Sequence, residues 1–218
     1  MYKESIDTPD VFWEKMAYSI TWYSKWHQVC IMDLYGPYIK WYIGASLNVC
    51  FNCIDRHLLN GHRNRVAIHA VGNELNDVRS YTYFELYQEI NKFAHVLSSF
   101  GVKKGSTVTI YLPLLPESII AMLACARIGA IHSYIFAGFS SDSVRTRIID
   151  SESSVVITTD GSYRGNKLVK HKDVINDAVK GLSFVKAVII LTKAKIDIQF
   201  NSNTDHYWCD LMEKAPKS

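Results

Sequence analysis

One polar loop carries residue types that bind phosphate: Arg164, Gly165, Asn166 and Lys167 lie within residues 158–167. Arg164 offers a planar fork of N–H donors to phosphate oxygens, and Lys167 adds a compact cation. Gly165 permits a ligand to approach the backbone closely. A site for a phosphate-bearing ligand is therefore one interpretation. The other is that both cations are solvated in a surface loop, and the run alone favours this second interpretation.

A glycine-bearing turn, Phe136-Ala137-Gly138-Phe139-Ser140, is the second candidate site. Gly138 lies where an apolar strand gives way to a helix, so a ligand could approach without meeting a Cβ atom. The helix that begins near Ser141 would point N–H groups at an anion. Taken alone the signal is weak, because a glycine in such a turn usually serves the backbone dihedral angles.

A third cluster, residues 48–57, contains amides, a carboxylate, a guanidinium and an imidazole within ten residues. A catalytic couple of Asp55 and His57 is conceivable, because a carboxylate can fix the tautomer of an imidazole. No nucleophile lies beside it. The favoured interpretation is structural: an ion pair of Asp55 with Arg56, together with helix caps that dock the segment.

The cysteines are odd in number and irregular in spacing, which indicates reduced thiols in a cytosolic protein. They are Cys30, Cys50, Cys53, Cys125 and Cys209. Zinc bound by Cys50 and Cys53 would need two further ligands, and His57 with His62 completes such a set only loosely. Unpaired thiols are favoured over both a metal site and a redox pair.

Composition limits the class of protein. The chain has 218 residues, 48% of them apolar and 21% charged, so it can bury a sizeable core. Its net charge of +3 is too small to indicate binding to nucleic acid or to an acidic membrane surface. Its start is polar, and no apolar run approaches the roughly 20 residues of a membrane span. We expect a cytoplasmic protein, and a nuclear location is compatible with the same observations. The oligomeric state cannot be read.

Beyond residue 60, strands alternate with helices. The expected strands span 65–70, 107–112, 131–136, 154–159 and 186–191, and the expected helices span 82–101, 116–129, 141–150 and 173–179. Apolar strands joined by helices predict an α/β fold, a parallel sheet with helices on both faces. The strand order cannot be read. Because ligands of such sheets bind at the carboxyl ends of the strands, we expect Gly138 and Arg164 at the same edge.

Residues 1–58 differ in composition from residues 59–218, and we expect two regions on that ground. Trp13, Trp22, Trp26, Trp41 and many tyrosines are spread through the first region, which should be a mainly helical, aromatic-rich extension. Its aromatic side chains either cap another surface or fill a small core of their own.

Several blocks in register resemble the N-terminal region of AMP-forming acetyl-CoA synthetases. The blocks are Leu47-Asn48-x-x-x-Asn52-Cys53-x-Asp55-Arg56-His57, Leu112-Pro113-x-x-Pro116-Glu117, the stretch from Ala124 to Ser140, and Arg164-Gly165-x-Lys167. The resemblance runs from about Trp13 to Leu211. It implies an adenylate-forming acyl-CoA synthetase, which joins acetate to ATP as acetyl-adenylate, releases pyrophosphate and passes the acetyl group to coenzyme A. Mg²⁺ normally accompanies the nucleotide.

The resemblance also assigns residues. The run 164–167 takes the position of the loop that holds the 3′-phosphate end of coenzyme A, and Gly138 matches a glycine near the path of the coenzyme. Two residues depart from the family pattern: Ala137 replaces the first glycine of the turn, and Asn166 replaces the second glycine of the basic loop. The methyl group of Ala137 narrows the range of backbone dihedral angles open to the turn. The side-chain amide of Asn166 either donates a hydrogen bond to phosphate or crowds it.

Other parts of the family pattern have no counterpart in these residues. There is no Ser/Thr/Gly-rich loop ending in Lys-Gly, so we expect an N-terminal portion that stops before the ATP phosphate loop. The ATP and Mg²⁺ sites, the acyl pocket and every catalytic residue would lie outside it, and this portion would be inactive alone. Propionate or acetoacetate as the acid, a noncatalytic coenzyme- or nucleotide-binding module, and a purely structural scaffold stay open as alternatives.

Overall fold

The computed structural model describes residues 1–32, 36, 38–72 and 77–216. It divides the chain into two compact units, Met1–Cys53 and Ile54–Ser218. The division lies a few residues before the change in composition near residue 60.

The first unit combines helices with an antiparallel hairpin. Its elements are α1 (Tyr2–Asp7), α2 (Pro9–Ala17), β1 (Gln28–Met32) and β2 (Ile39–Ile43). The aromatic side chains contact one another: the ring of Trp22 lies 5.3 Å from Trp26 and 5.2 Å from Tyr42, centroid to centroid. The rings therefore pack on one another, but Trp13 and Trp41 are each 41% exposed, so both a small core and a cap over another surface stay predictions. The hairpin was not predicted, because its strands show no alternation of buried and exposed residues.

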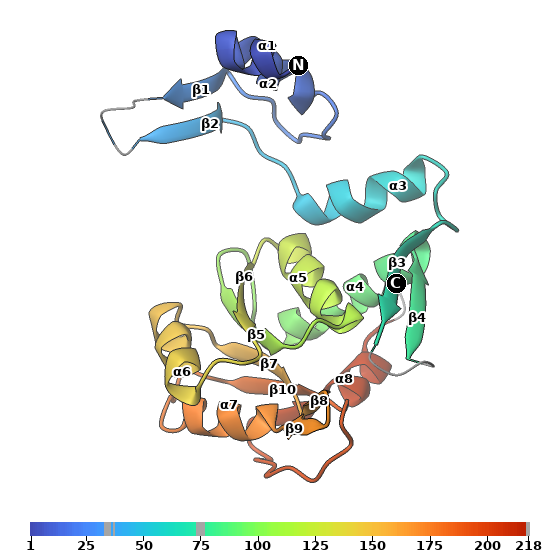
Figure 1. Cartoon of the computed structure of the whole chain (residues 1–218), viewed down its shortest axis with the longest axis vertical. Coiled ribbons are helices and arrows are strands. Elements are labelled where there is room, and N and C mark those ends of the chain that lie inside the picture. The colour runs from blue at the N-terminus through green and yellow to red at the C-terminus, as the bar shows by residue number, and fades with distance from the viewer. Residues whose placement is uncertain (33–35, 37, 73–76, 217–218) are drawn as a thin grey trace. The chain divides into compact units, whose positions relative to one another are not determined.

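The second unit is built on a five-stranded parallel sheet, which confirms the predicted α/β class (Figure 1). Its strands are β5 (Thr107–Leu112), β6 (Ile131–Phe136), β7 (Val155–Thr159), β10 (Ala187–Leu191) and β11 (Asp205–Tyr207). Their order is β11-β10-β7-β5-β6, and each pairs in parallel with its neighbours. The three central strands are almost wholly buried, which explains their continuous apolar sequences.

Helices cover both faces of this sheet, as expected. In Figure 1, α4 and α5 lie on one side of the sheet, and α6 and α7 lie on the other. The helices are α4 (Tyr83–Ser99), α5 (Pro116–Ile128), α6 (Ser141–Asp150), α7 (His171–Val179) and α8 (Trp208–Lys214). The ring of Trp208 stacks on Phe93 at 3.8 Å, which holds α8 against α4. No helix among the described residues is both long enough and apolar enough to cross a lipid bilayer.

The helix boundaries follow from local chemistry. Thr82 and Glu85 form the predicted capping box: the Thr82 hydroxyl accepts from the Glu85 N–H at 3.2 Å, and the Glu85 carboxylate accepts from the Thr82 N–H at 2.8 Å. Pro116 begins α5, and Gly129 ends it with a φ of +74°. The predicted apolar stripe of α4 is buried, and it consists of Leu86, Ile90, Phe93, Ala94 and Leu97.

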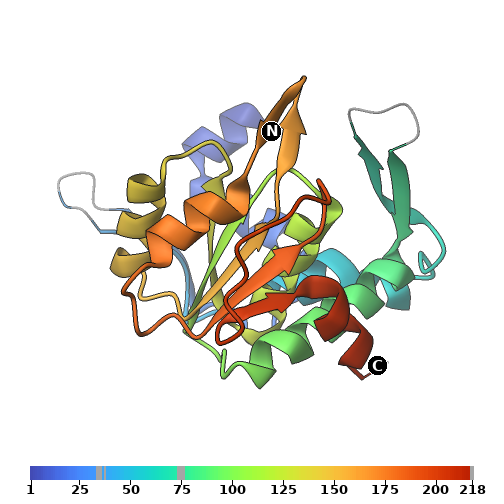
Figure 2. The same ribbon diagram turned by 90° about the horizontal axis from the view of Figure 1, so that it is seen from below.

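The remaining elements are short. They are η1 (Phe51–Asp55), α3 (Arg56–Leu59), β3 (Val66–Val71), β4 (Val78–Thr82), β8 (Ser162–Arg164) and β9 (Lys167–Val169). One of them, η1, spans the division between the two units, and the others belong to the second unit. Strands β3 and β4 pair antiparallel, as do β8 and β9, and Figure 2 shows both hairpins projecting from the body of the unit. The expected loop at 158–167 is thus partly a hairpin, which corrects the sequence-based prediction.

Candidate functional site

The two candidate phosphate segments lie at the carboxyl edge of the parallel sheet, as predicted. The turn with Gly138 directly follows β6, and the basic hairpin follows β7. Strand β5 lies between these two strands. Parallel strands end at one edge, so the loops that follow them form one rim, where open α/β sheets bind ligands.

The basic run forms the tip of the β8–β9 hairpin. Arg164 and Lys167 are paired across the strands, so Gly165 and Asn166 are the two turn residues. Gly165 has a φ of +59° and Asn166 has no positive φ, which is the pattern of a type II′ turn. A Cβ at Gly165 would meet nothing within 4 Å. The glycine is therefore required for its dihedral angle, not for space, and an amide at Asn166 causes no backbone strain.

The cations at this tip are available to a ligand. Arg164 and Lys167 are both exposed, and neither side chain makes a hydrogen bond or ion pair within the described part of the chain. They flank a two-residue turn, which puts a planar fork and a point charge side by side.

The Gly138 turn has a structural reason for its glycine. A Cβ at that position would lie 2.5 Å from the Phe136 ring, so the glycine leaves room for that ring. The Gly138 N–H donates to the Phe136 carbonyl at 2.8 Å, which closes the turn. Ser140 then caps α6 by accepting from the Ser143 N–H at 3.4 Å. A ligand role for Gly138 stays a prediction.

Three side chains that the sequence did not single out connect the turn with the hairpin. The hydroxyl of Tyr111, at the end of β5, donates to the Phe139 carbonyl at 2.9 Å. Its ring meets the His171 ring edge to face, with centroids 5.6 Å apart. Nε2 of His171 lies 2.8 Å from Oγ of Ser162, the first residue of β8. The strand order creates these contacts, and no sequence pattern carries that order.

Asp160 ties the base of the hairpin to the loop after β10. Its buried carboxylate accepts from the N–H groups of Gly161, Lys193 and Ala194 at 2.7, 2.8 and 3.0 Å, and from the Thr159 hydroxyl at 2.9 Å. Burial by itself raises the pKa of Asp160, but these hydrogen bonds outweigh it and hold the pKa below its ordinary value. The carboxylate is thus a structural anion that joins two loops of the rim.

The β3–β4 hairpin is attached to the same rim by two ion pairs. Arg79 holds Glu117, at the start of α5, in a bidentate pair at 2.6 and 3.2 Å, and Lys193 holds Asp77 at 2.7 Å. A cavity of about 310 Å³ lies next to these contacts, and Ser162, Tyr163, Pro113 and Lys193 are among its lining residues. The basic hairpin therefore stands beside a hollow in the rim.

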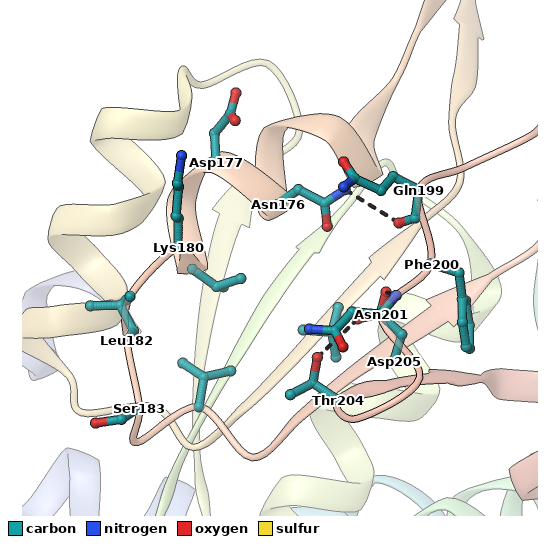
Figure 3. A pocket seen from close by; sticks show the side chains of 14 residues that line it. Asn176, Asp177, Lys180, Leu182, Ser183, Gln199, Phe200, Asn201, Thr204 and Asp205 are labelled. Carbon is teal, nitrogen blue, oxygen red and sulfur yellow. Dashed lines mark hydrogen bonds between the residues drawn. The ribbon is translucent and has the colours of Figure 1, made fainter.

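A larger cavity, of about 850 Å³, lies at the opposite edge of the sheet and contains none of the predicted site residues. Figure 3 shows Asn176 and Gln199 on one side of it and Thr204 and Asp205 nearby. Asp205, the first residue of β11, forms a buried ion pair with Lys172 at 2.8 Å. Cavity size alone would therefore indicate a binding site at the edge opposite to the carboxyl ends of the strands.

The third sequence cluster is structural, as favoured, but its ion pair has a different partner. Asp55 binds Arg127 of α5 in a bidentate pair at 3.0 and 2.7 Å, so the predicted pairing with Arg56 is wrong. The distance along the chain to Arg127 hid this contact from the sequence. The pKa of His57 is lowered, first by burial and then by Arg56 and His62.

The amides of the cluster serve local structure too. Asn48 accepts from the Phe51 N–H at 3.0 Å, and Asn52 exchanges hydrogen bonds of 2.8 Å with the backbone of Thr21. Cys30, Cys53, Cys125 and Cys209 are free thiols, and burial raises the pKa of Cys125 to about 12. Across the described residues, no three His, Cys, Asp or Glu side chains are grouped so that they could hold a metal ion.

A parallel sheet with a cationic hairpin and a glycine turn at its carboxyl rim defines an α/β domain of the open-sheet class. The sequence model of the AMP-binding enzymes matches residues 55–216, and that of the acetyl-coenzyme A synthetase N-terminus matches residues 1–53. The chain therefore belongs to the AMP-binding enzyme family.

Curated acetyl-coenzyme A synthetases match nearly the whole chain. The chain is 43% identical to an acetyl-coenzyme A synthetase of Emericella nidulans and 40% identical to one of Mycolicibacterium smegmatis, over 99% of its length in both cases. It covers 32% and 23% of those proteins, so it spans about a quarter to a third of the relatives' length.

Among solved structures, acetoacetyl-CoA synthetase from Streptomyces lividans matches with a TM-score of 0.83. The two chains are 24% identical, and the match covers 98% of this chain and 32% of the other. At that identity, the likeness establishes the fold.

Proposed function

We propose that this chain is the N-terminal part of an AMP-forming acetate:CoA ligase and forms part of its coenzyme A site. The observation that carries the proposal is the exposed pair Arg164 and Lys167 at the tip of a hairpin on the carboxyl rim. Its support comes from the acetyl-coenzyme A synthetase relatives, which match 99% of this chain, and from the two family models that match consecutive parts of it.

The reaction proposed for the whole protein has two halves. Acetate attacks ATP to form acetyl-adenylate and pyrophosphate, and the thiol of coenzyme A then takes the acetyl group and releases AMP. The hairpin serves the second half, because it holds the nucleotide end of coenzyme A while the thiol reaches toward the adenylate. We assign acetate as the acid, following the names of the relatives.

In this site the residues act by position and charge. The Arg164 guanidinium donates two parallel hydrogen bonds to the 3′-phosphate, and Lys167 adds a single charge on the other side of the turn. Gly165 fixes the turn, and Asn166 has an amide that can donate to the same phosphate. Gly138 lies on the coenzyme's path along the rim.

Magnesium belongs to the nucleotide half of the proposal. The described residues contain no group of ligands that fits the ion, so none of them is assigned to it. Bound with ATP, Mg²⁺ would neutralise phosphate charge during adenylation. We place the contacts to ATP, Mg²⁺ and acetate in the regions of the relatives that have no counterpart in these 218 residues.

A comparison of two ligands tests the coenzyme site. We expect the 218-residue chain to bind coenzyme A roughly ten- to hundredfold more tightly than 3′-dephospho-coenzyme A, because hydrogen bonds between charged groups are the strong ones. Isothermal titration calorimetry measures both affinities. In the double variant Arg164→Ala/Lys167→Ala the preference should disappear.

The control removes one exposed cation from the other edge of the sheet. Lys103 precedes β5, and Lys103→Ala should leave the preference intact. If the double variant keeps the preference for coenzyme A, or if the unchanged chain binds both ligands equally, the hairpin is not the 3′-phosphate site.

A further inference from the structure

The base of the basic hairpin is closed by a histidine that the proposed function does not use. His171 is the first residue of α7, directly after the hairpin, and only 1% of its surface is exposed. Its Nε2 lies 2.8 Å from Oγ of Ser162. Ser162 pairs with Val169 in the last rung of the hairpin, so this contact fixes the end of the hairpin opposite to Arg164 and Lys167.

The same imidazole also connects the hairpin to the glycine turn. Its ring packs against the buried ring of Tyr111, whose hydroxyl donates to the Phe139 carbonyl. A displacement of the His171 ring would therefore disturb both the base of the hairpin and the support of the turn. The buried His171 side chain therefore contacts the base of the hairpin directly and the glycine turn through Tyr111.

The surroundings of the ring favour its neutral form. Nδ1 is buried and has no hydrogen-bond partner among the described residues, so a second ring proton would point at no acceptor. Burial lowers the pKa of His171, and the Asp160 carboxylate offsets this only in part. Among the other groups around the imidazole, the Tyr111 ring packs against it edge to face and the Ser162 hydroxyl is neutral. The neighbouring Lys172 ammonium is paired with the Asp205 carboxylate.

We propose that neutral His171 is a positioning residue that sets the attachment of the Arg164–Lys167 hairpin to the sheet, so that protonation of its imidazole loosens the coenzyme site. The charged ring must either stay buried without an acceptor or leave its place, and leaving breaks the contact to Ser162. The coenzyme part of this inference rests on the proposed function, whereas the attachment of the hairpin does not.

The experiment compares two substitutions in the full 218-residue chain. His171→Gln keeps a side-chain amide that can bond to Ser162 but cannot titrate, and His171→Leu removes the bond. Amide hydrogen exchange of β8 and β9, expressed as protection factors between pH 5.5 and 7.5, reports the attachment. Protection of β5 and β7 in the same samples shows that the sheet remains folded.

We expect hairpin protection in the unchanged chain to fall roughly three- to tenfold as the pH is lowered, which is the effect of losing one ordinary hydrogen bond. His171→Gln should show a flat profile, and His171→Leu should be low at every pH. His132→Gln, a substitution of an exposed histidine on β6, should behave like the unchanged chain. A pH profile for His171→Gln equal to that of the unchanged chain, or full protection in His171→Leu, overturns the proposal.

Coenzyme A titrations of the same proteins separate this inference from the proposed function. The 3′-phosphate titrates near pH 6 itself, but it does so equally in every variant, so the difference between the unchanged chain and His171→Gln isolates the imidazole. If no variant distinguishes coenzyme A from its 3′-dephospho form while the protection profiles differ as expected, the proposed function fails and the positioning role of His171 holds.

Discussion

At the scale of single residues, the dihedral angle of one glycine determines the form of the basic tip. Gly165 is the first turn residue and has a φ of +59°, whereas Asn166 follows without a positive φ. Family resemblance treats both positions as glycines, but only the first has a backbone that excludes other residues. The departure at Asn166 is therefore compatible with an intact hairpin.

This difference gives a matched pair of substitutions. Gly165→Ala should destabilise the hairpin by about 1–2 kcal/mol, because a Cβ is strained at positive φ. Asn166→Ala adds no such strain and should leave the hairpin ordered. Hydrogen exchange of β8 and β9 without ligand measures both, and equal effects at the two positions would contradict the type II′ assignment.

Candidate residues could be predicted from the sequence only where their chemistry is local. The types and spacing of Arg164 and Lys167 were visible at once, and their placement on the rim followed from strand polarity. Tyr111 and His171 were not visible, because their contact depends on the packing of α7 against β5. Asp55 paired with Arg127 for the same kind of reason, since partners 72 positions apart leave no local pattern.

At the scale of elements, most boundaries in the second unit follow from local rules. The predicted strands 107–112 and 131–136 and the predicted helix 141–150 coincide with β5, β6 and α6, because prolines, glycines and caps mark their ends. Strands β4 and β11 were missed, since each is short and only partly buried. Strands β8 and β9, with three residues each, are too short for a period to appear.

The Asp160 carboxylate joins the loop after β7 to the loop after β10. Asp160→Asn should lower the free energy of unfolding by about 3 kcal/mol at pH 7, because a carboxylate that accepts several N–H bonds is replaced by a neutral group. Urea unfolding measures the change.

The pH dependence of that difference has a definite sign. The folded-state pKa of Asp160 is depressed, so its contribution is present above the unfolded pKa and is lost as the pH falls below about 4. The gap between the unchanged chain and Asp160→Asn should therefore shrink on acidification. A gap that stays constant down to pH 3 would show that the carboxylate charge does not matter.

At the scale of the whole molecule, the parallel sheet decides which edge can serve a ligand. A cavity of about 310 Å³ lies on the carboxyl rim beside the basic hairpin, and a larger one of about 850 Å³ lies at the amino ends of β10 and β11. The strand order, which no sequence pattern revealed, sets the glycine turn and the basic hairpin on the two strands that flank β5. We therefore propose that coenzyme A binds at the carboxyl rim.

Amide chemical shifts of the 218-residue chain, followed while coenzyme A is added, test this assignment most directly. We expect the shifts to concentrate in residues 137–140 and 162–169, and to be weak in the second segment when 3′-dephospho-coenzyme A is added instead. Shifts concentrated in residues 176–183 and 199–205, around the larger cavity, would contradict the account.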